Sequence, residues 1–193
     1  MTRIIAGRAR GRRLTVPQSK TRPTSDRVRE SLFSSLESAI DLDGARVLDL
    51  YAGSGALGLE ALSRGAAEVV LVDNAAAPQR AMSANVTAVG LPGARVEGCS
   101  AQEFLRRAPQ QYDLVLMDPP YDVDDAAVER VLQALTRGWL APGAVVVVER
   151  GDPGDALAWP EGFSQPWHRA FGGTHLLRAV WYGHDQVADE PDG

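Results

Sequence analysis

Cysteine, histidine and aromatic residues are scarce in this chain of 193 residues. The single cysteine, Cys99, excludes an intramolecular disulfide, and together with His168, His175 and His184 it matches no metal-ligand spacing. No apolar run reaches the ~20 residues that a membrane-spanning helix needs. With 45% hydrophobic and 23% charged residues, the composition is typical of one ordinary globular domain. We therefore expect no metal, no membrane segment and a reducing compartment.

Acidic residues are almost absent from the first 29 residues, which hold eight arginines and Lys20 against Asp26 alone. That segment carries a charge of +8, and the rest of the chain carries −13 within a total of −5. Arginine binds phosphate bidentately and thereby releases counterions, so nucleic acid is the expected partner. An organelle transit peptide and a solvated charged face remain alternatives. Ile4-Ile5 and residues 14–16 flank a Gly- and Arg-rich turn, which favours a short β-hairpin over a transit peptide.

An amphipathic helix is expected to follow this basic segment. Thr24 or Ser25 can cap it, and Arg27 and Arg29 lie off its apolar stripe. The stripe recurs at every fourth residue: Val28, Leu32, Leu36 and Ile40.

Short apolar strands alternate with helical stretches over the rest of the chain. Strands of this kind indicate a parallel sheet covered by helices on both faces. Near the end, Gly172-Gly173 separates two more strands, which predicts an antiparallel hairpin. Residues 184–193 are polar and acidic, and we expect them to be disordered. The expected strands cover residues 46–50, 69–73, 94–96, 112–118, 144–149, 167–171 and 174–182.

A glycine-rich turn follows the first of these apolar strands. Gly53, Gly55 and Gly58 match the dinucleotide-binding fingerprint, and Asp73 follows Gly53 by twenty residues, where it can bind ribose hydroxyls. Asp49 precedes the turn and would repel a pyrophosphate but attract the ammonium of S-adenosylmethionine. The sequence therefore favours S-adenosylmethionine over NAD. A turn without a ligand, with Asp49 stabilising the loop, remains the structural alternative.

The fourth apolar strand ends in the tetrapeptide Asp118-Pro119-Pro120-Tyr121. In an open parallel sheet this position lies beside the glycine turn. The Asp118 carboxylate and the Pro119 carbonyl can accept both hydrogens of an exocyclic amine and make its nitrogen nucleophilic, while Tyr121 can stack on a base removed from its helix. A simple Pro-Pro turn is the structural alternative. We expect methylation of a base amine at this position.

Together these motifs resemble the class I S-adenosylmethionine-dependent methyltransferases, and more closely the RsmD family of bacterial 16S ribosomal RNA guanine-N2 methyltransferases. The similarity extends over most of residues 3–150. The arginine-rich start and the Arg-Pro-Thr segment are the features that point to this family in particular. The matching segments are Arg3 to Gly7, Gly11 to Leu14, Arg22 to Glu30, Asp49 to Gly65, and Asp118 to Tyr121.

The resemblance implies an α/β fold: a doubly wound, Rossmann-like, seven-stranded, mostly parallel sheet with an antiparallel C-terminal hairpin and a short N-terminal β-hairpin extension. Residues 1–23 are expected to form the basic extension that contacts RNA, 24–183 the methyltransferase domain, and 184–193 the acidic tail. The resemblance also implies a cytoplasmic enzyme that methylates one guanine of 16S rRNA in the small ribosomal subunit or its assembly intermediate. A monomer is expected, since nothing in the sequence requires more.

Three sets of site residues follow from the motifs and the resemblance. Ser100 replaces the aspartate or asparagine that many methyltransferases have at the adenine-recognition position, so the Ala101 N–H is the expected contact there. The catalytic set is Asp118, Pro119, Pro120 and Tyr121; the cofactor set is Asp49, Tyr51, Gly53, Ser54, Gly55, Asp73, Asn74, Ser100 and Ala101; the RNA-binding set is Arg8, Arg10, Arg12, Arg13, Arg22, Thr24 and Arg27.

Several other functions stay open at this stage. Methylation of an adenine amine in DNA or RNA uses the same tetrapeptide chemistry, and protein glutamine methylation is a more remote relative. A nicotinamide oxidoreductase is disfavoured by Asp49, and a non-catalytic RNA-binding module would not need Asp118 or Tyr121. Cys99 lies outside the tetrapeptide loop, so we interpret it as a buried structural thiol rather than a nucleophile. The four tryptophans are interpreted as packing residues.

Overall fold

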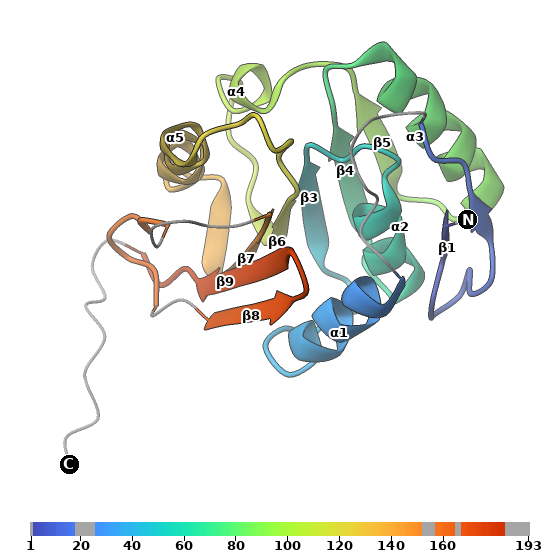
Figure 1. The fold of residues 1–193 in the computed structure, drawn as a ribbon, viewed down its shortest axis with the longest axis horizontal. Helices are drawn as coiled ribbons and strands as arrows, with labels where there is room; N and C mark the ends of the chain where they lie inside the picture. The colour runs from blue at the N-terminus through green and yellow to red at the C-terminus, as the bar shows by residue number, and fades with distance from the viewer. Residues whose placement is uncertain (1, 18–25, 152–156, 165–166, 184–193) are drawn as a thin grey trace.

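The computed structural model describes residues 2–17, 26–151, 157–164 and 167–183. Within these residues, seven strands form a central sheet in the order β5-β4-β3-β6-β7-β9-β8 (Figure 1). The chain starts the sheet in the middle and reverses direction between β3 and β6, as in a doubly wound fold. The strands are β3 (Arg46–Leu50), β4 (Glu68–Val72), β5 (Ala94–Glu97), β6 (Tyr112–Met117), β7 (Leu140–Arg150), β8 (Trp167–Phe171) and β9 (Thr174–Val180).

The sheet is parallel from β5 to β7 and antiparallel from β7 to β8. This arrangement confirms the predicted seven-stranded, mostly parallel sheet with its C-terminal hairpin. A separate antiparallel pair, β1 (Thr2–Arg3) and β2 (Arg13–Leu14), confirms the N-terminal hairpin. The predicted strands at Ile4-Ile5 and residues 14–16 are each displaced toward the N-terminus by one or two residues.

Helices cover both faces of the sheet. On one face, helices α1 to α3 and the N-terminal hairpin pack on a core of buried side chains that includes Leu114 and Val147. On the other face, α4 and α5 pack on a second core that includes Val115 and Val148. Successive strand residues belong to opposite cores because their side chains alternate across the sheet. The helices are α1 (Asp26–Leu36), α2 (Ala56–Ser63), α3 (Ala76–Val89), α4 (Ala101–Phe104) and α5 (Asp125–Leu135).

The N-terminal hairpin is fastened to α2 by a buried carboxylate. Glu60 is fully buried and accepts the N–H groups of Ile5 at 2.7 Å and Ala6 at 3.0 Å, together with Nε of Arg64 at 2.8 Å. Because the N–H groups of Ile5 and Ala6 donate to Glu60, they are not used in strand pairing. The observed strand β1 accordingly ends at Arg3.

Helix α1 differs from expectation in one respect that matters for the site. Val28, Leu32 and Leu36 are buried as predicted, whereas Ile40 lies beyond the helix and is partly buried. Arg27 is exposed, but Arg29 is completely buried, although both were predicted to lie off the apolar stripe.

The prediction for Cys99 is only partly correct, whereas the tryptophans pack as predicted. Cys99 was predicted to be buried but is only partly so, and Nη2 of Arg107 donates to its sulfur at 3.4 Å. Trp139 and Trp181 are buried in the second core, and Trp159 packs against it, as expected of packing residues. Trp167 is partly buried against the first core. The candidate caps Thr24 and Ser25 and the tail 184–193 lie outside the described residues.

Candidate active site

A cleft of about 720 Å³ opens at the carboxyl ends of the parallel strands. Its walls come from the glycine loop after β3, the ends of β4, β6 and β7, the start of α4, helix α1 and the N-terminal hairpin. This edge is the place where ligands bind in open α/β sheets, next to the reversal of strand order between β3 and β6. The volume is within the range of small-molecule and cofactor sites.

Asp49 forms the floor of the cleft. Its side chain is 1% exposed, Oδ2 accepts the N–H of Gly58 at 2.9 Å, and Oδ1 is buried without a hydrogen-bond partner. Burial raises the pKa of this carboxyl to about 7; the Gly58 N–H opposes the rise and the charge of Asp73 adds to it. An unpartnered buried carboxylate oxygen is stabilised by a cation. Asp49 therefore suits a ligand with a positively charged group.

The glycine loop lies against the floor because it has no side chains at the close contacts. A Cβ at Gly58 would lie 2.5 Å from Leu71 and 3.1 Å from Oδ2 of Asp49, so only glycine lets α2 approach β4 and the Asp49 carboxylate this closely. Gly55 has a φ of 76° and precedes α2. Tyr51 also has a positive φ, of 62°, which is uncommon for a residue with a side chain. Its phenol lines the cleft, and burial raises its pKa, opposed by Gln102 and the charge of Arg150.

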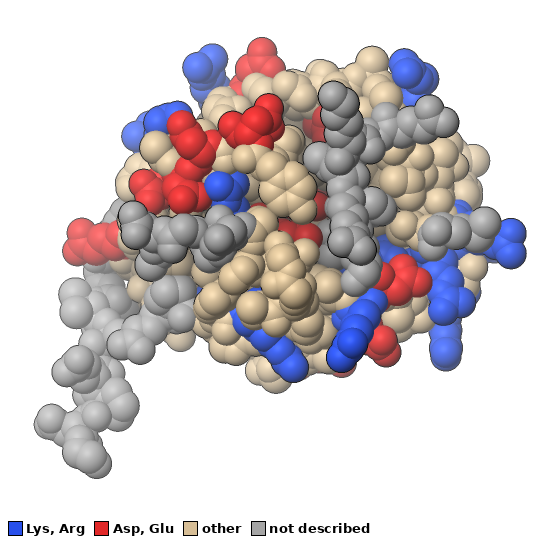
Figure 2. All heavy atoms as spheres, viewed as in Figure 1, with Lys and Arg blue, Asp and Glu red and all other residues tan. Residues whose placement is uncertain are grey.

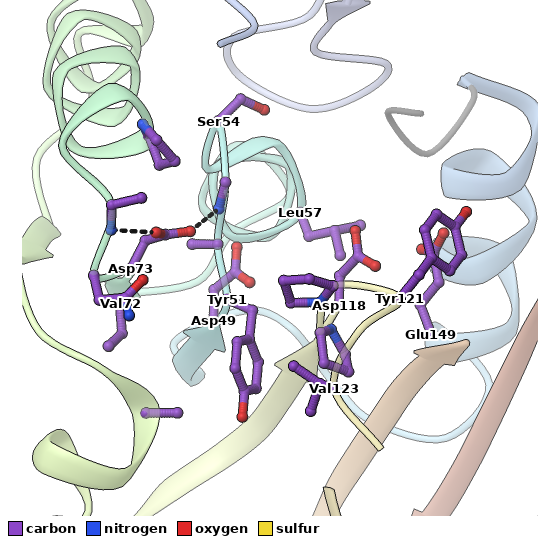
Figure 3. Close-up of a pocket in the computed structure, with 18 of the residues that line it drawn as sticks. Asp49, Tyr51, Ser54, Leu57, Val72, Asp73, Asp118, Tyr121, Val123 and Glu149 are labelled. Atoms are coloured by element: carbon purple, nitrogen blue, oxygen red, sulfur yellow. Dashed lines mark hydrogen bonds between the residues drawn. The ribbon is translucent and has the colours of Figure 1, made fainter. Parts of the chain in front are cut away.

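Asp73 lies at the end of β4 and faces the glycine loop (Figure 3). Its Oδ2 accepts the N–H of Gly53 at 3.0 Å, and its Oδ1 accepts the N–H of Ala75 at 2.9 Å. These bonds fix the carboxylate at the cleft wall, and each oxygen retains a second lone pair for a ligand hydroxyl. Asn74 is exposed and also lines the cleft.

Ser100 begins α4 as its N-cap. Its Oγ accepts the N–H of Glu103 at 3.2 Å, and its own N–H donates to Oε2 of Glu103 at 2.9 Å, which completes a capping box. The Ser100 side chain is thus engaged within its own helix. Ala101, the next residue, also lines the cleft and was the predicted backbone contact.

The tetrapeptide lies on the opposite wall, where Figure 3 draws Asp118, Tyr121 and Glu149 on the same side of the pocket. Pro119 is buried, Pro120 is exposed, and Tyr121 is 65% exposed. The Tyr121 ring lies over Gly151, since a Cβ at Gly151 would be 2.7 Å from Cε1 of the ring. The ring is therefore supported by backbone and still largely open to a planar ligand.

Among the charged residues that line the cleft but were not predicted for the site, two are buried. Glu149 is 8% exposed at the end of β7, and Arg29 is fully buried in α1. Nη2 of Arg29 donates to the Arg3 carbonyl and to Oδ1 of Asp26, both at 2.7 Å. Its Nε and Nη1 are buried without a partner in the described part of the chain. The position of Glu149 at the end of an apolar strand was a usable signal. Arg29 lies in the family-matching segment Arg22 to Glu30, but its place off the apolar stripe predicted exposure rather than a buried position at the cleft.

The predicted RNA-binding arginines divide into described and undescribed residues. Arg8, Arg10, Arg12 and Arg13 are exposed on the hairpin, and Arg27 is exposed on α1; Arg22 and Thr24 lie outside the described residues. In Figure 2 basic side chains gather at the lower right of this face, where Figure 1 places the hairpin and α1, and acidic ones gather at the upper left near α5.

Among the described residues there is no group of three or more His, Cys, Asp or Glu side chains that could hold a metal ion. No helix in the described ranges is long and apolar enough to span a bilayer.

Comparison with known proteins identifies the family. Residues 2–180 match the family described as Conserved hypothetical protein 95. Ribosomal RNA small subunit methyltransferase D of Escherichia coli (strain K12) is 43% identical over 149 residues, which are 76% of this chain and 73% of that protein. The chain belongs to the RsmD family. The methyltransferase of the same name from Haemophilus influenzae is 38% identical over 152 residues, 76% of this chain and 77% of that protein.

Solved structures agree with the assignment of this RsmD-family protein as a methyltransferase. The putative methyltransferase yhhF from Escherichia coli superposes with a TM-score of 0.83 at 34% sequence identity, over 93% of this chain and 97% of that chain. The family assignment confirms the resemblance predicted from the glycine loop, the tetrapeptide and the arginine-rich start. The individual site residues remain predictions that the cleft geometry supports to different degrees.

Proposed function

We propose that this RsmD-family protein transfers a methyl group from S-adenosylmethionine to the exocyclic N2 amine of a guanine in 16S rRNA, within the small ribosomal subunit or its assembly intermediate, in the cytoplasm. The observation that carries the proposal is the shared cleft, which brings the unpartnered carboxylate oxygen of Asp49 and the amine-accepting tetrapeptide together. The name of the Escherichia coli relative supports the choice of small-subunit rRNA.

The residues present fit S-adenosylmethionine. Oδ1 of Asp49 would accept the ammonium of its methionyl part, the Asp73 carboxylate would accept the ribose hydroxyls, and the Ala101 N–H would donate to the adenine ring. Tyr51, Gly53, Ser54 and Asn74 line the cleft and would contribute loop and wall contacts. Gly55 does not line the cleft, and its N–H donates to the Ala52 carbonyl, so its part is to shape the loop. When bound, S-adenosylmethionine supplies an electrophilic methyl group on a sulfonium.

The tetrapeptide would activate the acceptor. A guanine amine is a poor nucleophile because its nitrogen lone pair is delocalised into the ring. The Asp118 carboxylate and the Pro119 carbonyl would accept its two hydrogens, localise the lone pair and stabilise the positive charge that develops on nitrogen. The Tyr121 ring, supported by Gly151, would hold the base in line for attack. As the N–C bond forms, the S–C bond breaks, and the amine proton leaves to Asp118 or water.

The exposed arginines of the hairpin would hold the RNA next to the cleft. The hairpin contributes Thr2 and the residues after β2, Val16 and Pro17, to the cleft wall, so RNA bound on Arg10, Arg12 and Arg13 would lie close to the tetrapeptide. Phosphate contacts of this kind position a nucleic acid without reading its sequence.

Transfer of labelled methyl from S-adenosylmethionine to small ribosomal subunits of a strain lacking this protein tests the proposal. Digested nucleosides are identified by mass. We expect label in N2-methylguanosine, and we expect Asp118→Ala to abolish it while cofactor affinity and the melting temperature stay near wild-type values. Label in N6-methyladenosine instead would establish the adenine-amine alternative. No label despite cofactor binding would refute the assignment of 16S rRNA as substrate.

A further inference from the structure

We infer that Glu149 and Arg29 read the Watson–Crick edge of the target base and restrict this cleft to guanine. The inference deepens the proposed function and rests on it. Neither residue is needed to hold S-adenosylmethionine or to accept the hydrogens of the amine. Both nevertheless line the cleft: Arg29 is a fully buried cation on α1, and Glu149 is a largely buried carboxylate at the end of β7.

The strand register places Glu149 beside Asp118. Met117 of β6 pairs with Val148 of β7, so Asp118 and Glu149 are the next residues along the two neighbouring parallel strands. Leu116 and Val147, two residues earlier, both point into the first core, so the alternation turns Asp118 and Glu149 to this same face. Neighbouring strands are about 4.8 Å apart, which lets two carboxylates contact adjacent groups on one base edge.

Helix α1, which carries Arg29, covers that same face of the sheet. Its guanidinium donates through Nη2 to the hairpin backbone and to Asp26, which fixes its position. Nε and Nη1 are left as buried donors without a partner in the described residues. Such donors are satisfied by a water or by a ligand acceptor in the cleft, and the carbonyl oxygen of a base is a suitable one.

The two purines that carry an exocyclic amine differ in what flanks it. In guanine the amine is followed by the N1–H donor and then the O6 acceptor. In adenine the neighbour of the amine is N1 with a lone pair, and no carbonyl follows. A carboxylate at Glu149 accepts N1–H but repels the adenine N1 lone pair, and Arg29 can donate to O6. The charge pattern therefore complements guanine and opposes adenine.

The first test replaces the base. In a small-subunit RNA, 2-aminopurine is placed at the guanine that the labelling experiment maps; this base keeps the 2-amine but lacks N1–H and O6. We expect the wild-type protein to methylate it at least about 100-fold more slowly than guanine, because two polar pairs are lost. Equal rates on the two bases would overturn the inference, while N2-methylguanosine formation on the normal RNA would leave the proposed function intact.

The second test replaces the side chains on both substrates. Glu149→Gln should slow methylation of guanine about 10- to 100-fold but change the rate on 2-aminopurine little, because that base has no N1–H to lose. Arg29→Lys should likewise slow methylation of guanine and change the rate on 2-aminopurine little, because 2-aminopurine has no O6 for Arg29 to bind. Asp122→Asn, which removes a carboxylate at the exposed rim of the cleft, is the matched control and should affect neither rate.

The different effect of each substitution on guanine and on 2-aminopurine separates base reading from a structural role. A variant that merely distorted the fold, or an Arg29 that bound an RNA phosphate, would slow both substrates by the same factor. That result for both variants would overturn the inference. Cofactor affinity, measured for each variant, verifies that the protein is folded, and absence of N2-methylguanosine with wild-type protein would instead count against the proposed function.

Discussion

Asn85 pairs with the backbone of Thr15 through both ends of its amide: Oδ1 accepts the Thr15 N–H at 2.7 Å and Nδ2 donates to the Thr15 carbonyl at 2.8 Å. Nδ2 also donates to the carbonyl of Ser54, at 2.8 Å. This side chain, 1% exposed on α3, therefore joins the segment that follows β2 of the basic hairpin to the glycine loop. The loop and the hairpin are positioned by the same residue.

Asn85→Ala is expected to lower the free energy of unfolding by about 2–4 kcal/mol, because it leaves three backbone groups without their partner. It should also weaken S-adenosylmethionine binding about tenfold through the loosened loop. Titration calorimetry and denaturant unfolding check the two effects. Ser83→Ala removes an exposed hydrogen bond from the same helix and serves as the control. Unchanged cofactor affinity in a folded Asn85→Ala variant would contradict the claim that Asn85 positions the glycine loop for cofactor binding.

Asp49 should make cofactor binding depend on pH. The bound ammonium requires the ionised carboxylate, whose pKa is raised to about 7 in the ligand-free protein. Affinity should therefore rise about tenfold per pH unit up to about pH 7 and fall again above about pH 8, where the amine of the ligand loses its proton. Asp49→Asn should bind weakly at every pH and show no such slope. Equilibrium binding between pH 5 and 9 measures this, and a flat wild-type profile would exclude the contact.

Asp49 should also reduce the stability of the ligand-free protein at high pH. Its folded-state pKa is above the unfolded value of 3.8, so the folded state binds the proton more tightly. The penalty for ionisation is absent below about pH 4, grows up to about pH 7 and is constant above it, reaching up to about 4 kcal/mol. Asp49→Asn should therefore gain stability relative to wild type as pH rises across this range. A stability difference independent of pH, in thermal unfolding, would refute this.

The hairpin arginines should control RNA affinity through salt. Replacing Arg10, Arg12 and Arg13 together with alanine should weaken RNA binding and reduce the slope of log affinity against log salt by about 2, at ~0.7 per lost phosphate contact. Cofactor affinity should not change. Exposed arginines on the other side of the sheet supply a control of equal charge: Arg106, Arg130 and Arg137. Equal effects of the two triple variants would show that overall charge, not the hairpin, binds RNA.

Gly151→Ala should impair the support for Tyr121. The added Cβ would lie 2.7 Å and 2.9 Å from Cε1 and Cδ1 of the ring, so the exposed ring must move. Loss of a stacking platform costs ~1–3 kcal/mol per base, and we expect turnover to fall at least about fivefold with little change in melting temperature. Gly173→Ala, where nothing lies within 4 Å, is the control. Unaltered turnover in Gly151→Ala would show that the ring position is not used.

Local sequence patterns determined the elements and the chemistry. The predicted strand 46–50 coincides with β3, because a run of apolar residues can be buried on both faces only within a covered sheet. The motifs on β3, β4 and β6 identified most of the cleft, since the carboxyl ends of parallel strands meet at one edge. The predictions for these residues needed only their chemical types, their spacing in the chain and the family resemblance.

Tertiary contacts decided the rest. Arg29 is buried because the N-terminal hairpin lies against α1, where the Arg3 carbonyl, 26 residues earlier in the chain, accepts its N–H. The helical periodicity of α1 carries no information about this contact with a distant segment. Strand β7 extends to Leu140–Arg150 because β6 and β9 pair with it on both sides. Glu149 lies beside Asp118 because β6 and β7 are neighbours in register. Hydrogen bonds between segments distant in sequence therefore set which charged groups face the cleft, whereas the apolar pattern alone set the strands that carry them.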